Sequence, residues 1–185
     1  MEELKNYEPY DEEEERTKRF LMDFYDRHAG DIFTRENPEG HMTASAWVVN
    51  PARDKTLMAY HNIYGSFAWL GGHADGDTDL RRVAKRELME ETGLKNPRYL
   101  TDDIFSLDMG TVKEHVRRGK IVPPHYHIDF CYLFEAGEDE ILRIAEGENS
   151  AVKWIPVADM EKEVLEKHML PVYAKLAKKV KERQL

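Results

Sequence analysis

The sequence has a single cysteine, Cys131, among its 185 residues, so no disulfide can form within the chain. It also lacks a signal peptide and any apolar run of the roughly 18 residues that a membrane-spanning helix needs. We find no internal repeat and no low-complexity tract. These absences favour a protein of the reducing cytoplasm that does not act at a membrane.

Basic residues are also scarce relative to acidic ones. The chain has 27 Lys and Arg against 36 Asp and Glu, a formal net charge of −9. This balance argues against nucleic acid or an anionic membrane as the main partner. An anionic substrate would have to be received by a bound cation and local basic groups. The apolar fraction of 41% is ordinary, and the length suits one domain, residues 1–185, with a core of its own.

The most informative stretch is residues 72–94, GHADGDTDLRRVAKRELMEETGL. At about 100° per residue, a helix over residues 79–91 has one apolar face. That face consists of Leu80, Val83, Ala84 and Leu88. Glu87 and Glu91 fall within it, and Glu90 lies on its edge. Three carboxylates are therefore expected to turn inward.

Inward carboxylates on one helix need a counter-charge. At spacings of three and four residues they repel by about 0.2–0.5 kcal/mol per exposed pair, and by more when they are desolvated. A bound cation removes this repulsion, and hard oxygen ligands suit Mg²⁺ or Mn²⁺. The alternative is a solvated acidic face, which is common on helices. The inward direction favours the metal site.

The same stretch resembles the signature of the Nudix hydrolases. That signature reads Gly, five residues, Glu, seven residues, then Arg-Glu-apolar-any-Glu-Glu-any-Gly-apolar. Gly72 fills the first position and residues 86–94 fill the last stretch. Thr78 stands where the family has its first Glu, which supports the structure around the loop and helix. The flanking Asp77 and Asp79 are the candidates to replace it.

The resemblance implies a fold, an activity and a cofactor. The fold would be α+β, an α/β/α sandwich with a mixed central β-sheet. The activity would be hydrolysis of a phosphoanhydride in a nucleoside diphosphate linked to another moiety, by metal-activated water attacking phosphorus. One to three Mg²⁺ or Mn²⁺ ions would be held by the three glutamates and the backbone carbonyl of Gly72. Arg86 would orient the acids, with Glu87 and Glu91 as candidates for the general base. Dimers are common in the family, so a homodimer stays open.

Further candidates lie outside the signature. Glu148, in a loop before the last predicted strand, is an extra ligand or base candidate, beside Glu114 and Glu146. His73 follows the glycines and is expected to touch substrate. His125, His127 and Asp129 alternate along a predicted strand and would share one face. Same-face positions are about 6.6–6.8 Å apart along a strand, so all three can hardly bind one metal. They either line a polar pocket that contacts phosphate or sugar, or form a hydrogen-bonded core network.

The rest of the chain predicts strands and helices on both sides of the signature. An acidic first turn and an apolar stripe indicate a helix over 11–29, within an N-terminal helical extension of residues 1–40. Strands are predicted at 43–49, 55–60, 66–70, 104–116, 121–134 and 152–155, with a turn at 117–120. C-terminal helices within 156–185 are predicted near 158–168 and 171–183, Pro171 opening the second.

Two other functions remain open. A module of the same fold could bind a nucleotide or nucleotide-sugar without turnover, a reading supported by Thr78. An isopentenyl diphosphate isomerase would need a Cys and a Glu facing an allylic diphosphate, but Cys131 lies far from the glycines in sequence. Tyr64, Phe67 and Trp69 precede the glycines and either pack in the core or stack a nucleobase.

Overall fold

The structure is a computed structural model that describes residues 2–117 and 119–183. Its strands are β1 (Gly40–Val49), β2 (Lys55–His61), β3 (Ser66–Ala68), β4 (Leu70–His73), β5 (Arg98–Tyr99), β6 (Ser106–Val112), β7 (His115–Arg117), β8 (Lys120–Val122), β9 (His125–Glu135) and β10 (Asn149–Pro156). Its helices are α1 (Glu2–Asn6), α2 (Glu12–His28), α3 (Leu80–Thr92), α4 (Met160–Glu163) and α5 (Leu170–Glu182). Short 3-10 turns occupy Val157–Asp159 and Lys167–Met169.

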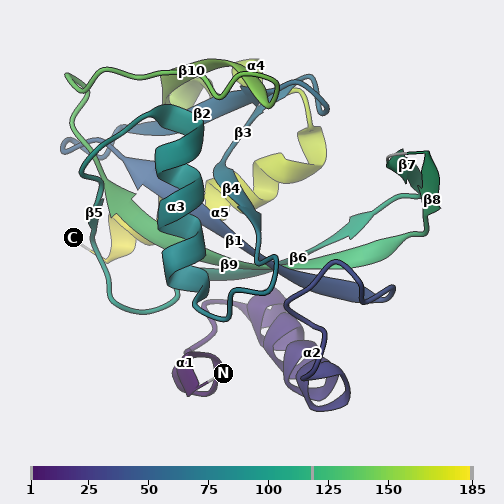
Figure 1. Ribbon diagram of the computed structural model, residues 1–185. Coiled ribbons are helices and arrows are strands. Elements are labelled where there is room, and N and C mark those ends of the chain that lie inside the picture. The colour runs from purple at the N-terminus through teal and green to yellow at the C-terminus, as the bar shows by residue number, and fades with distance from the viewer. Residues whose placement is uncertain (1, 118, 184–185) are drawn as a thin grey trace.

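A mixed sheet forms the centre of the described chain. Its main path runs β10-β2-β1-β9-β5, while β3 pairs with β2, β4 with β1 and β6 with β9. The pair of β1 and β9 is parallel, whereas β1 and β4 are antiparallel. All of β1 is buried, because the strand is covered on both faces. In Figure 1, α3 lies in front of β1 and β9, and α5 lies behind them. The predicted α+β sandwich with a mixed sheet is confirmed.

Side-chain alternation along β1 separates two apolar clusters. Met42, Ala44 and Ala46 belong to the cluster that contains the apolar face of α3, as predicted from the helical wheel. Trp47 and Val49 belong to the other cluster, which α5 covers with Tyr173, Leu176 and Val180. The signature helix is therefore held against one face of the sheet by an ordinary apolar stripe, and Glu87 and Glu91 are on the same side of the helix.

Several predicted elements are confirmed and capped as their sequences indicate. The Asp11 side chain accepts hydrogen bonds from the first-turn backbone of α2, from Glu13 N at 3.0 Å and Glu14 N at 2.9 Å. Helix α3 ends at Gly93, whose φ of 73° is the left-handed conformation that glycine adopts without strain. Two short elements, α1 and β5, were not predicted.

Two predicted segments are wrong in detail. The single strand at 66–70 is two strands, because the chain leaves β2 after Ala68 and pairs with β1 from Leu70. The single helix at 158–168 is broken at Val164, which is extended and fully buried. The next two backbone N–H groups donate to Ser66 Oγ, at 2.8 Å from Leu165 and 3.3 Å from Glu166, instead of continuing the helix.

The predicted pair of long strands is also interrupted. Strands β6 and β9 pair antiparallel from Ser106↔Cys131 to Val112↔His125. Beyond them, β7 and β8 form a separate two-stranded sheet, which projects from the body in Figure 1. Of the turn predicted at 117–120, Arg118 lies outside the described residues.

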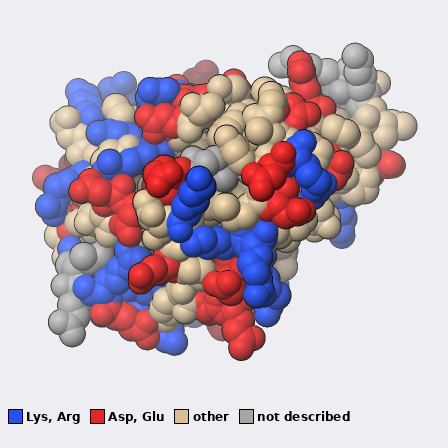
Figure 2. All heavy atoms as spheres, turned by 90° about the horizontal axis from the view of Figure 1, so that it is seen from below, with Lys and Arg blue, Asp and Glu red and all other residues tan. Residues whose placement is uncertain are grey.

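Within the described ranges, no helix is both long and apolar enough to cross a membrane. Figure 2 shows the face that carries α1 and α2, where acidic and basic side chains are interspersed. The net negative charge is therefore not gathered into a single patch on this face.

Candidate active site

Glu91 is the buried carboxylate of α3. It is 7% exposed, and its Oε2 accepts a hydrogen bond of 3.0 Å from the backbone N–H of Gly71. Gly71 has a φ of 153°, and a Cβ there would lie 2.5 Å from the Ala44 carbonyl oxygen. Only glycine can present its N–H to Glu91 in this position. This hydrogen bond therefore links β4 to the signature helix α3.

Glu87 packs directly against the second glycine. A Cβ on Gly72 would lie 2.5 Å from both Cδ and Oε2 of Glu87. The Arg86 guanidinium donates to the other carboxylate oxygen, with Nη2 2.8 Å from Glu87 Oε1. Any larger residue at position 72 would displace Glu87, so the glycine creates the space in which carboxylate and backbone meet.

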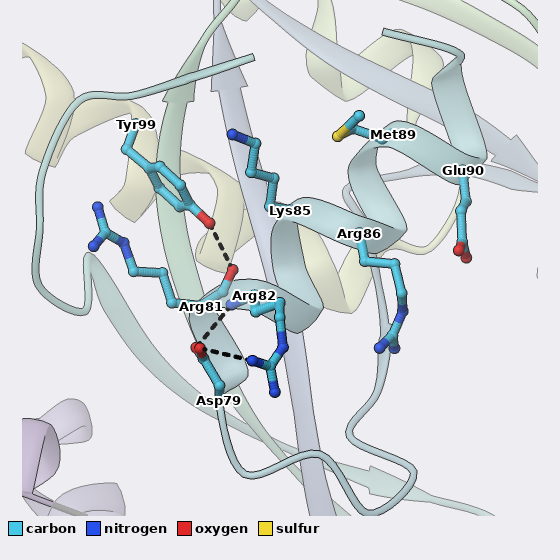
Figure 3. A pocket seen from close by; sticks show the side chains of 8 residues that line it. All are labelled: Asp79, Arg81, Arg82, Lys85, Arg86, Met89, Glu90 and Tyr99. Carbon is cyan, nitrogen blue, oxygen red and sulfur yellow. Dashed lines mark hydrogen bonds and ion pairs between the residues drawn. The ribbon is translucent and has the colours of Figure 1, made fainter. Parts of the chain in front are cut away.

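Glu90 is exposed, so the prediction that all three carboxylates turn inward is wrong for this one: its place at the edge of the apolar face leaves it in solvent. Figure 3 shows Arg86 and Glu90 on one side of α3, with Lys85 and Arg81 directed to the other. Three carboxylates of graded exposure therefore follow one another around the helix: Glu91 buried, Glu87 half-buried and Glu90 exposed.

Burial and mutual repulsion disfavour the charged forms of these acids. Burial raises the pKa of Glu91 to about 8. The hydrogen bond from Gly71 lowers this pKa, whereas the nearby carboxylates of Glu87, Glu148 and Glu90 raise it further. Burial also raises the pKa of Glu87, against the ion pair with Arg86. A divalent cation would reverse both effects, because it stabilises the ionised carboxylates. The donor set is all oxygen, which suits Mg²⁺ or Mn²⁺.

Glu148 is distant from the signature in sequence but lies near Glu87 and Glu91 in the structure. Its carboxylate is close enough to raise the pKa of both Glu87 and Glu91. The next residue fixes this approach, since Asn149 Nδ2 donates a 3.0 Å hydrogen bond to the Glu91 carbonyl. The structure thus brings Glu148 beside the signature acids, whereas no interaction of Glu114 or Glu146 with them is seen in the described chain.

Thr78, at the position of the missing signature Glu, is exposed. Its neighbour Asp77 accepts hydrogen bonds from Arg82 Nη2 at 2.6 Å and Nε at 3.0 Å, and Asp77 Oδ2 lies 3.8 Å from Arg86 Nη1. The bonds from Arg82 hold the pKa of Asp77 below its ordinary value. Asp79 caps α3 by accepting from the Arg82 backbone N–H at 3.0 Å. These two acids link the loop to the helix without a glutamate.

The predicted histidines meet on the opposite face of β4. His73 Nε2 and His125 Nε2 each lie 3.3 Å from His127 Nε2. A fourth member, which the sequence did not predict, is His41 of β1, buried among the other three rings. Its position directly opposite His127 in the parallel pair of β1 and β9 explains the contact. A lone histidine at the start of a strand gave no signal by itself.

Asp129 shares the histidine face of β9 but points to other partners. Its carboxylate accepts from Thr43 Oγ1 at 2.7 Å and from Ser45 Oγ. Burial raises its pKa to about 7, against these two hydrogen bonds. Cys131, the next residue on this face, is fully buried, and burial raises the pKa of its thiol. A buried thiol with a raised pKa is no nucleophile, which disfavours the isomerase alternative.

The aromatic residues before the glycines divide between core and surface. Phe67 is buried and Trp69 packs against Tyr173 with ring centroids 5.7 Å apart. Tyr64 is 52% exposed and stacks on His61 with centroids 4.2 Å apart. Phe67 and Trp69 therefore pack in the core, which was one of their two predicted roles. Tyr64 has an exposed ring that a ligand could contact.

A hollow of about 590 Å³ lies beside α3 on its solvated side (Figure 3). It is lined by Asp79, Arg81, Arg82, Lys85, Arg86, Met89, Glu90 and Tyr99. The Tyr99 hydroxyl donates to the Arg81 carbonyl at 2.9 Å, and the Arg81 guanidinium lies over the Tyr99 ring. Glu87 and Glu91 are not among the lining residues. We therefore place the candidate active site at the carboxylates and not in this hollow.

Comparisons with known proteins agree with the signature and the fold. A family model of the NUDIX domain matches residues 40–176. The solved dihydroneopterin triphosphate pyrophosphohydrolase of E. coli is 10% identical with a TM-score of 0.58, over 78% of this chain and 97% of that one. A hydrolase of the NUDIX family from Clostridium perfringens is 22% identical with a TM-score of 0.53, over 75% and 96%. The Nudix hydrolase RenU from M. smegmatis is 15% identical with a TM-score of 0.51, over 78% and 85%. A search of curated proteins finds no match.

Proposed function

The chain belongs to the NUDIX family and is a Nudix-type pyrophosphohydrolase, and on this premise we propose its substrate class and its cofactor. The substrate is a nucleoside diphosphate linked to another moiety, cleaved at the phosphoanhydride. The cofactor is Mg²⁺ or Mn²⁺, in one to three ions. The observation that carries this proposal is the convergence of Glu87, Glu91 and Glu148 beside the backbone of two glycines.

The proposed ligands are Glu87, Glu90, Glu91 and the backbone carbonyl of Gly72. When bound, the cation supplies charge neutralisation for the diphosphate and lowers the pKa of the attacking water. Glycine at position 72 leaves the carbonyl uncovered by any side chain of its own. The close packing of Glu87 against Gly72 supports this choice of ligands.

The remaining side chains position these groups and move the proton. The 2.8 Å bond from Arg86 holds Glu87 in one orientation. Glu91, buried and tied to the Gly71 N–H, is fixed in place and is the proposed proton acceptor. Glu148 is exposed and approaches from the loop before β10, so it serves as an additional ligand or as an alternative base. His73, His125 and His127 stay predicted contacts of the substrate phosphate or sugar.

Hydrolysis that depends on a divalent metal tests this function. The purified protein is incubated with nucleoside triphosphates, dinucleoside polyphosphates, ADP-ribose, nucleotide sugars and coenzyme A, with Mg²⁺, with Mn²⁺ and with EDTA. We expect release of phosphate or nucleoside monophosphate from at least one substrate, abolished by EDTA and restored by excess Mg²⁺. Ligand binding without product over a long incubation would instead identify a non-catalytic module of the same fold.

The Glu148→Gln variant separates the two roles of this residue. A general base contributes on the order of 10²–10⁴-fold to the rate, so its loss lowers kcat at every metal concentration. If Glu148 is a ligand, excess Mg²⁺ restores most of the activity. The control is Glu146→Gln, an exposed acid two residues earlier, which should behave as wild type. Unchanged kcat and metal dependence in Glu148→Gln would remove this residue from the site.

A further inference from the structure

Four histidines from three strands form one cluster on the face of the sheet opposite α3. His41 lies on β1, His73 on β4, and His125 and His127 lie on β9. The His41 ring is central, with its centroid 5.1 Å from that of His73 and 4.9 Å from those of His125 and His127. Strand register produces this arrangement, because β1 pairs His41 with His127 and sets Thr43 opposite His73.

The ring nitrogens converge at distances that suit one metal ion. One nitrogen from each of His41, His73 and His127 lies within 4.8 Å of the other two. Nε2 of His73 is 3.3 Å from Nε2 of His127. Two imidazole nitrogens at 2.0–2.1 Å from one tetrahedral ion are themselves about 3.3–3.4 Å apart.

Contacts between the rings also support the cluster. His127 lies between His73 and His125, with its Nε2 3.3 Å from the Nε2 of each. His125 is oriented by the Pro123 carbonyl, 2.9 Å from its Nδ1. In a neutral ring this bond makes Nδ1 the donor and directs the Nε2 lone pair toward His127. The Pro123 carbonyl therefore fixes the ring that packs against the ligand His127.

We propose that His41, His73 and His127 bind one transition-metal ion of the zinc class, with His125 packed beside His127 and the fourth position open to water or an anionic ligand. Imidazole ligands select Zn²⁺, Cu²⁺, Ni²⁺ or Fe²⁺ over Mg²⁺. Three histidines with an open position are typical of reactive zinc sites, and a phosphate oxygen is a suitable fourth ligand.

This site is separate from the carboxylates of α3. Adjacent residues of a strand point to opposite faces, and Gly72 contacts Glu87 whereas the next residue, His73, contacts His127. Strand β4 therefore lies between the two groups of ligands. Loss of one site should leave ion binding at the other intact, and this expectation separates the proposal from the hydrolytic function above.

The test is zinc binding by the full chain after removal of bound metal. In the presence of excess Mg²⁺, which occupies the acidic site, calorimetric titration with Zn²⁺ and elemental analysis after dialysis should give one zinc ion per chain. The His127→Gln variant should bind at least 10-fold more weakly. Two controls should keep wild-type zinc affinity: His168→Gln, at an exposed histidine outside the cluster, and Glu91→Gln, which alters the acidic site.

Titration with Co²⁺ keeps the proposal testable if His127→Gln does not fold. We expect the wild-type protein to develop the visible absorption of tetrahedral Co²⁺ with nitrogen ligands, and Zn²⁺ to displace it. Absence of zinc uptake by the wild type, or equal affinity in a folded His127→Gln, would overturn the proposal. Loss of zinc binding in Glu91→Gln would do the same, because it would place the ion on α3.

Discussion

The Glu91→Gln variant should lose on the order of 10²–10³-fold in kcat/KM, about 3–4 kcal/mol of transition-state stabilisation. Glu91 is the most buried of the three signature acids, and it is fixed by the hydrogen bond from Gly71. An amide can accept that bond but can neither neutralise a divalent cation nor take a proton from water. Steady-state kinetics at saturating Mg²⁺ measure the effect.

The same variant should fold at least as well as the wild type when metal is absent. Because the pKa of Glu91 rises from 4.5 to about 8 on folding, its contribution to stability is fully present below pH 4.5 and is lost as the pH rises to 8. Glutamine does not titrate, so the variant does not lose stability in this way as the pH rises. Without metal, the unfolding temperature of the wild type should therefore fall relative to Glu91→Gln across this range, and Mg²⁺ should reduce the difference.

A matched control for the kinetics is Glu161→Gln, which removes an exposed carboxylate on α4, far from the signature in sequence. It should retain wild-type activity. Equal activity of Glu91→Gln and wild type would refute the assignment of the site, whatever substrate the panel reveals.

The Glu14→Gln variant should be the most destabilising single polar change, at about 3–5 kcal/mol. Glu14 is fully buried in α2, and its Oε1 lies 2.9 Å from Lys179 Nζ and 3.1 Å from Lys175 Nζ of α5. The same oxygen accepts from Ser106 Oγ of β6 at 2.8 Å. Removing the negative charge leaves the buried Lys179 without its counter-ion, at a point where two helices and the sheet meet.

The effect should depend on pH in a defined direction. Burial alone would raise the pKa of Glu14, but Lys175 and Lys179 outweigh it and hold the pKa at about 2. A lowered pKa gives stability that is present above the ordinary value of 4.5 and is lost as the pH falls to 2. Thermal unfolding at pH 7 should therefore show a decrease of roughly 6–20 °C in Tm, which disappears near pH 2.

The neighbouring Glu13→Gln is the control for this variant, since Glu13 is exposed on the same turn of α2. Its Tm should stay within about 1–2 °C of wild type, as for other surface changes. A Tm of Glu14→Gln equal to that of Glu13→Gln at pH 7 would show that the buried ion cluster adds no net stability.

Elements with a strong local pattern were predictable from the sequence. The helix at 79–91 was predicted because its apolar residues repeat with the helical period, and the same period placed Glu87 and Glu91 inward. Its end at Gly93 followed from the backbone freedom of glycine. The split of residues 66–70 into β3 and β4 was not predictable, because it depends on which strand each half pairs with.

The sequence by itself determined the family signature, the class of fold and the inward direction of Glu87 and Glu91, because all three depend on the spacing of residues that are close together in the chain. Only the tertiary structure decided that Glu148 reaches the acids and that His41 joins His73 and His127. These groups are far apart along the chain, and they meet through the register of β1 with β4 and β9 and through the bond from Asn149 to α3. Strand register and loop docking are set by packing of the whole core, so no local pattern contains them.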